Sequence, residues 1–330
     1  MSISEAKPGP KWQATFERLW PAYRRWFLSE GPRARPGYQT SQKKLRQYMP
    51  ELAPVYESLV DLAGGGDLEA RFLSLYCPPP YLAGCSQAVW SRERPVLVRN
   101  YDYSPRLFEG RLLHTCWRRP VIAMVDCLWG ALDGINDAGL SASLSFGGNK
   151  TVGTGFGVPL ILRYILETCD DAESAAEVLK RVPTHMHYNI TVVDRKGAFF
   201  TAHVSPDRPA IIRDEPVSTN HQERIEWDDY ARATTTVERK KHLEQRRADP
   251  EETEQSFIDR FLEAPLYSTK FERAFGTLYT AAYYPQSLEV EYRWPGRSLR
   301  QTIDGFKEGR MVVRLKRERE TLNEKRETLN

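Results

Sequence analysis

Residues 77–85 divide the chain into two parts with different hydrophobic periods. Upstream, large apolar residues recur every three or four positions, which is the period of an amphipathic helix. This stripe includes Trp12, Phe16, Trp20, Tyr23 and Phe27. The run Cys77-Pro78-Pro79-Pro80-Tyr81 cannot continue a helix, and from Cys85 onward the pattern becomes that of strands. The sequence therefore predicts a helical N-terminal segment, an extended linker, and a sheet that begins at Cys85.

The order of the predicted elements downstream of Cys85 favours an α+β fold. Strand-like runs between 86 and 146 precede helices at 159–167 and 172–181. Strands resume between 189 and 219, followed by one helix at 231–246, a second at 251–262, and strands between 278 and 294. Because the helices come in blocks, a doubly wound parallel sheet is disfavoured. We expect two antiparallel sheets packed face to face between helical layers. The predicted segments are 1–84 (helical), 85–310 (sheet domain) and 311–330, a charged tail that contains Arg-Glu-Thr-Leu-Asn twice.

The composition is that of an ordinary globular protein. The 330 residues carry 47 Lys and Arg against 44 Asp and Glu, a balance that gives no indication of a nucleic-acid or membrane partner, and we expect neither. The chain has no apolar run of about 18 residues and no secretory signal pattern, so we expect a cytoplasmic protein. Five cysteines form no C-x-x-C pair and do not cluster with histidines. We therefore expect no disulfide scaffold, metal or cofactor. The composition is compatible with a homo-oligomer as well as with a monomer.

Cys85 differs from the other cysteines in its neighbours. Gly84 before it removes the side chain that would crowd attack on the Gly84 carbonyl. Arg99, fourteen residues later, can stabilise a thiolate or a developing oxyanion. Asp102 lies three residues beyond Arg99, which places the two on opposite faces of a regular strand. We therefore expect the strand to end or bulge near Tyr101 if both are to reach Cys85.

Four short motifs occur in an order that resembles a known enzyme family. They are Gly84-Cys85-Ser86, Arg99-Asn100-Tyr101-Asp102, Gly134-Ile135-Asn136-Asp137-Ala138-Gly139-Leu140 and Thr219-Asn220-His221. Together they resemble the N-terminal-nucleophile hydrolases of the choloylglycine hydrolase and acyl-CoA:6-aminopenicillanic acid acyltransferase type, over roughly residues 83–305. The acyltransferase-like branch is the more similar one.

The resemblance implies an αββα sandwich and a precursor that cleaves itself between Gly84 and Cys85. In such a reaction the cysteine attacks the preceding carbonyl, an N-to-S shift gives a thioester, and water releases a new α-amino group. An α-amine has an unperturbed pKa of about 7.7–8.0, so it can act as the base for its own thiol at neutral pH. The resemblance also implies that segment 1–84 is a pro-segment, which we expect to remain bound.

The roles of the other site residues follow from the resemblance by position. Arg99 matches the arginine beside the nucleophile, and Asp102 matches the carboxylate that orients the α-amino group. Asn220 matches an asparagine of the oxyanion hole, and Arg239 resembles a late supporting arginine, with a helix-surface position as the alternative. Choloylglycine hydrolases have an asparagine where this chain has Ser145, whose hydroxyl or a backbone N–H would have to donate instead. Bile-salt specificity is therefore not implied.

The sequence leaves three readings of the function open. The first is a self-processing amidohydrolase or acyltransferase that acts on a small linear amide or an acyl thioester, with acyl-CoA as one candidate donor. The second is a papain-like hydrolase that pairs Cys85 with His221, although such nucleophiles usually sit at a helix N-terminus and Cys85 opens a strand. The third is an inactive binding protein that keeps the fold and never cleaves.

Overall fold

The computed structural model describes residues 1–315, so the repeated pentapeptide of the predicted tail lies outside the described residues. The N-terminal segment is mostly helical, as the sequence predicts. It contains α1 (Pro10–Phe27), α2 (Tyr38–Tyr48), a short 3-10 turn (Pro50–Leu52), α3 (Ala53–Leu62) and α4 (Asp67–Leu73). The strand β1 (Ser2–Glu5) was not expected from the sequence.

The first sheet has eight strands in the order β1-β4-β5-β6-β7-β8-β9-β10. After β1, its members are β4 (Leu112–Thr115), β5 (Val121–Asp126), β6 (Gly130–Asn136), β7 (Ser141–Phe146), β8 (Tyr188–Val193), β9 (Phe199–Val204) and β10 (Ile211–Arg213). Neighbours from β4 to β10 pair antiparallel. The pair β1 and β4 is parallel, with Ser2 opposite Leu112. The prediction of purely antiparallel sheets is therefore wrong at this edge.

The second sheet follows the order β11-β2-β3-β13-β14-β15, and β12 pairs with β13. Its strands are β2 (Gly84–Trp90), β3 (Val96–Tyr103), β11 (Val217–Ser218), β12 (Thr269–Lys270), β13 (Phe275–Tyr284), β14 (Glu289–Trp294) and β15 (Arg297–Thr302). In the central ladder Cys85 is opposite Tyr101, and Gly84 is opposite Asp102. The two sequence motifs that carry Cys85 and Asp102 thus lie on adjacent strands.

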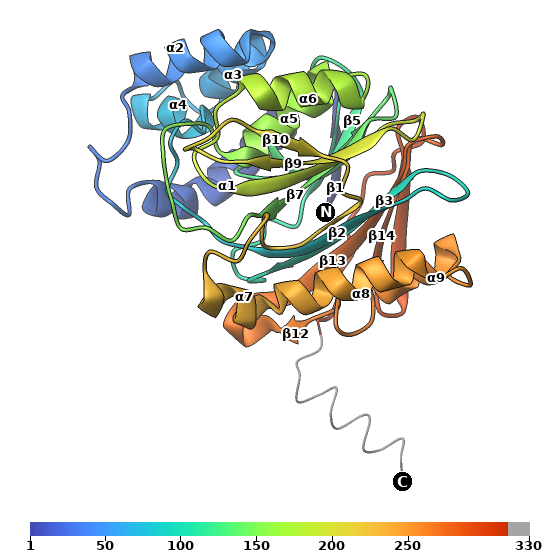
Figure 1. The fold of residues 1–330 in the computed structure, drawn as a ribbon. Coiled ribbons are helices and arrows are strands. Elements are labelled where there is room, and N and C mark those ends of the chain that lie inside the picture. The colour runs from blue at the N-terminus through green and yellow to red at the C-terminus, as the bar shows by residue number, and fades with distance from the viewer. Residues whose placement is uncertain (316–330) are drawn as a thin grey trace.

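The sheets stack between helical layers, which confirms the αββα sandwich (Figure 1). α5 (Val158–Thr168) and α6 (Ala172–Arg181) cover the outer face of the first sheet, and α7 (Asp228–Thr234), α8 (Thr236–Ala248) and α9 (Glu254–Arg260) cover the second. A single helix was predicted where α7 and α8 lie. Thr235 divides it because this residue has a left-handed backbone, with φ of 48°.

Side chains alternate along β2 and β3, so each strand contributes to two cores. Leu97 and Tyr101 belong to the core between the sheets, whereas Val96 and Val98 pack under α8 and α9. The same alternation separates the polar residues of this ladder into an inner and an outer set. No helix in residues 1–315 combines the length and the apolar character needed to cross a membrane.

Candidate active site

The thiol of Cys85 lies in the closed interior between the sheets. Its side chain is fully buried, and the Arg99 guanidinium donates to its Sγ, from Nη2 at 3.1 Å. Burial raises the pKa of the Cys85 thiol to about 11, and the positive charge of Arg99 opposes that rise. The Cys85 thiol is therefore protonated at neutral pH and shielded from solvent.

Arg99 is held in place by Asp133 of β6, a residue that the sequence analysis did not single out. Arg99 Nη1 donates to Asp133 Oδ2 at 2.6 Å and to the Leu132 carbonyl at 2.7 Å, and both charged side chains are fully buried. The hydroxyls of Tyr279 and Tyr283 also donate to this carboxylate. A lone carboxylate inside the otherwise apolar β6 was the available signal, because buried charges need partners.

Asn220 holds the peptide nitrogen of Cys85. The Cys85 N–H donates to Asn220 Oδ1 at 2.9 Å, and the Asn220 amide donates to the Ala83 carbonyl at 3.3 Å and the Phe146 carbonyl at 3.2 Å. Its own backbone N–H donates to Thr236 Oγ1 at 2.7 Å, which ties the loop after β11 to the start of α8. Asn220 thus bonds the chain on both sides of the Gly84 residue.

Arg239 reaches the same place from α8. It is buried, and its Nη1 donates to the Cys85 carbonyl at 2.7 Å and to Ser86 Oγ at 2.8 Å. Its Nη2 donates to Asn220 Oδ1 at 2.7 Å. The structure therefore places Arg239 beside Cys85 rather than on the helix surface.

Asp102 lies on the outer face of β3, opposite Gly84. Thr277 Oγ1 donates to its Oδ1 at 2.7 Å, and Arg239 lies 3.4 Å from its Oδ2. Burial raises the pKa of Asp102, and Arg239 opposes the rise. A Cβ at Gly84 would lie 3.0 Å from the Asp102 Cβ, so only glycine fits without displacement.

The expected irregularity near Tyr101 is not in β3. This strand continues to Tyr103, and the register shift is in its neighbour β13, between Thr277 and Tyr279. The prediction was wrong because it assumed that both polar groups must point at the thiol. Arg99 reaches Cys85 Sγ from the inner face, while Asp102 approaches the backbone at Gly84 from the outer face.

Two further predicted residues do not contact the thiol. Ser145 Oγ donates to the Thr219 carbonyl at 2.8 Å. His221 Nδ1 is bonded to Thr236 Oγ1 at 2.9 Å, and burial lowers the pKa of His221 to about 4. Within residues 1–315, Cys85 Sγ has no histidine partner, which disfavours the papain-like reading.

Tyr230 of α7 is a site residue that the sequence analysis missed. Its hydroxyl donates to the Ala83 carbonyl at 2.7 Å, beside the Asn220 amide. Burial raises the pKa of Tyr230 well above its usual value, which keeps the hydroxyl protonated as a donor. Two donors therefore converge on the carbonyl one residue before Gly84.

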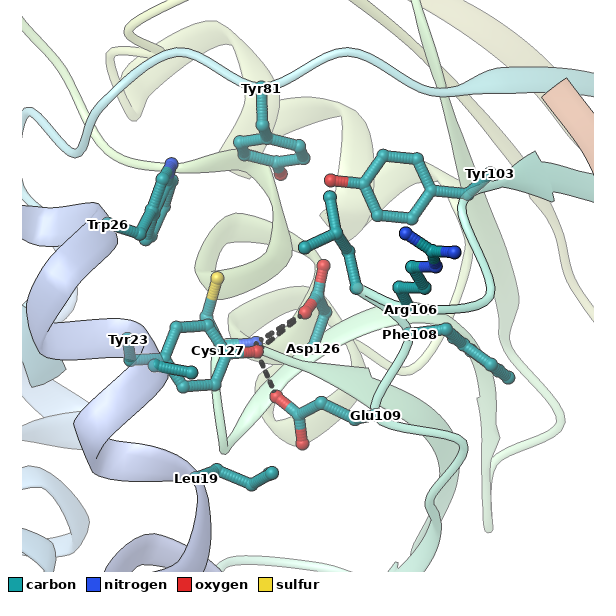
Figure 2. Close-up of a pocket in the computed structure, with 12 residues that line it drawn as sticks. Leu19, Tyr23, Trp26, Tyr81, Tyr103, Arg106, Phe108, Glu109, Asp126 and Cys127 are labelled. Carbon is teal, nitrogen blue, oxygen red and sulfur yellow. Dashed lines mark hydrogen bonds between the residues drawn. The ribbon is translucent and has the colours of Figure 1, made fainter. Parts of the chain in front are cut away.

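Two cavities lie near this centre. One of about 240 Å³ opens on the outer face and is lined by Gly84, Asp102, Arg239, Tyr267 and Lys270 among others. The second, of about 200 Å³, has Tyr81 and Tyr103 in its wall (Figure 2). Within residues 1–315, no group of three or more His, Cys, Asp or Glu side chains is placed to hold a metal ion.

The comparison with protein families gives one match. Residues 90–299 match the family described as acyl-coenzyme A:6-aminopenicillanic acid acyl-transferase. The matched range begins after Cys85 and includes Arg99, Asp102, Asn220 and Arg239. A search of curated protein sequences gives no match.

Several solved structures are similar at low sequence identity. An N-acylethanolamine-hydrolyzing acid amidase ortholog from Caenorhabditis elegans is 16% identical with a TM-score of 0.47, covering 70% of this chain and 100% of that one. Penicillin V acylase from Agrobacterium tumefaciens is 14% identical with a TM-score of 0.44, covering 63% and 82%. A mutant conjugated bile acid hydrolase from Clostridium perfringens is 13% identical with a TM-score of 0.43, covering 70% and 97%.

Proposed function

The chain belongs to the acyl-coenzyme A:6-aminopenicillanic acid acyl-transferase family, and from this membership we propose that it is a self-processing enzyme with Cys85 as its N-terminal nucleophile. One observation carries the proposal. Asn220 holds the Cys85 nitrogen at 2.9 Å while Arg99 holds its sulfur at 3.1 Å. The atom that would be released and the atom that would attack are thus each fixed by a separate partner.

Processing is proposed to begin at the Gly84 carbonyl. Cys85 Sγ attacks that carbon, a C–S bond forms as the C–N bond to Cys85 breaks, and the thiol proton ends on the released nitrogen. Water then hydrolyses the thioester, which leaves a carboxylate on Gly84 and restores the thiol. Glycine supports this step because no side chain at position 84 obstructs the attack, and a Cβ there would lie only 3.0 Å from the Asp102 Cβ.

In the processed enzyme, the neutral α-amine of Cys85 is proposed to take the thiol proton. The sulfur then attacks the acyl carbon of the substrate, and the leaving amine takes up the proton. We assign Asp102 to orienting the α-amine, because it lies beside Gly84 at the end of the ladder. Arg239 is assigned to fixing Asn220 and the Cys85 carbonyl.

The oxyanion is proposed to form near the amide of Asn220. Removing one such donor costs about 10²–10³ in rate. Tyr230 is a better second donor than Ser145, because its hydroxyl already donates to the same Ala83 carbonyl as Asn220. Ser145 instead bonds the Thr219 carbonyl.

The substrate class is a small linear amide or an acyl thioester such as an acyl-CoA. Water or an amine can take the acyl group from the same thioester intermediate, so hydrolysis and transfer share the proposed residues. All five cysteines are free, which supports the proposed cytoplasmic location because a reducing compartment prevents pairing.

The mass and N-terminal sequence of purified protein test the proposal. We expect two chains, residues 1–84 and 85–330, and a single intact chain for Cys85→Ala. The two wild-type chains should co-elute on a sizing column, because α1 buries Trp12, Phe16 and Phe27 and exposing them is unfavourable. A wild-type protein that is fully active on acyl amides as one uncut chain would overturn the free-amine mechanism.

A further inference from the structure

The cavity of about 200 Å³ is lined by aromatic and acidic side chains, with the basic side chain of Arg106 beside them (Figure 2). Its aromatic walls are Tyr23, Trp26, Tyr81, Tyr103 and Phe108, and its acidic walls are Glu109 and Asp126. These residues come from α1, the linker before β2, the end of β3 with the loop after it, and the end of β5. At its rim Leu107 is 64% exposed, so the cavity is accessible from solvent.

The two carboxyl groups share a single hydroxyl. Tyr23 lies within hydrogen-bond distance of both Glu109 Oε1 and Asp126 Oδ1, but its one proton can serve only one of them at a time. Backbone N–H groups of Leu128 and Cys127 donate to the same two oxygens at 2.8 Å. The second oxygen of Glu109 is buried and has no hydrogen-bond partner within residues 1–315.

The pair also lacks an ion-pair partner among residues 1–315. Arg111 bonds Thr15, although its charge opposes the rise in the Glu109 pKa, and the exposed Arg106 lines the same cavity without a bond to either acid. Burial, together with their mutual repulsion, raises the pKa of Glu109 to about 7, and burial raises the pKa of Asp126. A positive ligand would relieve both the repulsion and the unpaired oxygen.

We propose that this cavity binds an organic ammonium group carried by the amide substrate or the acyl acceptor. Aromatic faces attract such cations through their quadrupoles, and Trp26, Tyr81 and Tyr103 line the side of the cavity above Asp126 in Figure 2. A metal ion is less well suited, since the aromatic walls supply no ligand atoms other than phenol oxygens and the acids number only two.

The ring of Tyr101 lies between this cavity and Cys85, the proposed nucleophile. Tyr101 is opposite Cys85 in the ladder, and its ring centroid is 5.7 Å from that of Tyr103 and 6.0 Å from that of Phe108. A ligand whose reacting end reaches Cys85 would have to extend past Tyr101 to place its ammonium end in this cavity. This assignment of the ligand as substrate or acceptor rests on the proposed function.

Both proposed chains contribute to the cavity. Tyr23, Trp26 and Tyr81 precede the proposed cut, whereas Glu109 and Asp126 follow it. Loss of segment 1–84 would remove Tyr23, Trp26 and Tyr81 from the aromatic wall, and with Tyr23 the hydroxyl that the acids share. Ammonium binding therefore requires that the segment remain in place after processing.

Binding of choline to the full-length Cys85→Ala protein tests the inference without turnover. Titration calorimetry should detect choline, and its neutral isostere 3,3-dimethylbutanol should bind at least tenfold more weakly. Glu109→Gln with Asp126→Asn should weaken choline binding at least tenfold, whereas Glu57→Gln, at an exposed acid on α3, should not. If the double variant misfolds, Trp26→Leu replaces it with the same expectation.

Three results would overturn the inference: equal affinity for choline and its isostere, no choline binding by a folded protein, or binding of Mg²⁺ in its place. The proposed function is tested separately, on the wild-type protein. If that protein is cut and hydrolyses amides but does not bind choline, the ammonium site is wrong and the proposed function stands. Choline binding by a wild-type chain that neither cuts nor turns over amides would keep the site and defeat the proposed function together with the assignment of the ligand as substrate.

Discussion

The two faces of the β2 and β3 ladder are built differently around the same cysteine. On the inner face Cys85, Arg99 and Asp133 are fully buried, and every hydrogen-bond partner of the sulfur comes from the interior. On the outer face Gly84 and Asp102 line a cavity of about 240 Å³ under α7 and α8. The inner face holds the thiol, and the outer face surrounds the peptide bond that precedes it.

Under the proposed function, this difference separates two tasks of Cys85, which are to hold its sulfur in place and to release its peptide nitrogen. The closed face can fix the sulfur because buried ion pairs and hydrogen bonds are screened little by solvent. The open face leaves space beside Gly84, where a water molecule or a new terminus has to be accommodated. Substitutions on one face should therefore impair one task more than the other.

The largest effect is expected on the inner face, from Asp133→Asn. This change leaves Arg99 as a buried cation without its carboxylate, and removing one partner of a buried pair costs about 3–5 kcal/mol. Urea unfolding of Cys85→Ala with and without Asp133→Asn measures the loss in an uncut chain. Tyr283→Phe, which removes one hydroxyl donated to Asp133, should cost only about 1 kcal/mol. A loss below that value for Asp133→Asn would contradict a supporting role.

A smaller effect is expected on the outer face, from Thr277→Val. Its hydroxyl donates to Asp102 and so stabilises the ionised carboxylate; without it the pKa of Asp102, already raised by burial, rises further. Activity that requires ionised Asp102 falls as pH decreases through that pKa, so the acid limb of kcat/KM should move upward by about one pH unit.

Thr280→Val is the matched control for this prediction. Thr280 lies on the same strand and donates to Asn100 rather than to Asp102. The acid limb of the kcat/KM profile of this variant should coincide with that of the wild type. If both variants shift the limb equally, Asp102 is not the group that titrates.

The smallest effect is expected from His221→Asn. The new amide can replace the imidazole in the bond to Thr236, and His221 does not contact the sulfur. Activity should stay within about threefold of wild type, since no hydrogen bond to the reacting atoms is removed. Complete loss of activity in a folded protein would restore the papain-like reading.

Local hydrophobic patterns were enough to predict most of the helices and strands. The helices of the N-terminal segment and the strands from β2 to β9 follow hydrophobic periods that each segment carries by itself. β1 was missed because its four residues gain strand character only by pairing with β4, more than a hundred residues away. The division between α7 and α8 was missed because threonine rarely adopts the backbone that Thr235 has.

Site residues could be predicted only where they lie near Cys85 in the sequence or belong to one of the family motifs. Cys85, Arg99, Asp102 and Asn220 could be named, but their partners depend on packing. Asp133 is 34 residues from Arg99, and Tyr230 is 147 residues from Ala83. Neither has a spacing that distinguishes it from core or surface residues.

The parallel pairing of β1 with β4 has a consequence for the lifetime of the molecule. Through this pairing the start of the chain forms an edge strand in the sheet of what would become the second chain, and the amine of Met1 donates to the Gly110 carbonyl. If the bond after Gly84 is cut once the protein has folded, β1 and β4 no longer belong to one covalent chain, and an unfolded enzyme could not restore their pairing within a single chain. The mature enzyme would then be assembled once only, and its persistence would be governed by the rate at which it unfolds rather than by an equilibrium.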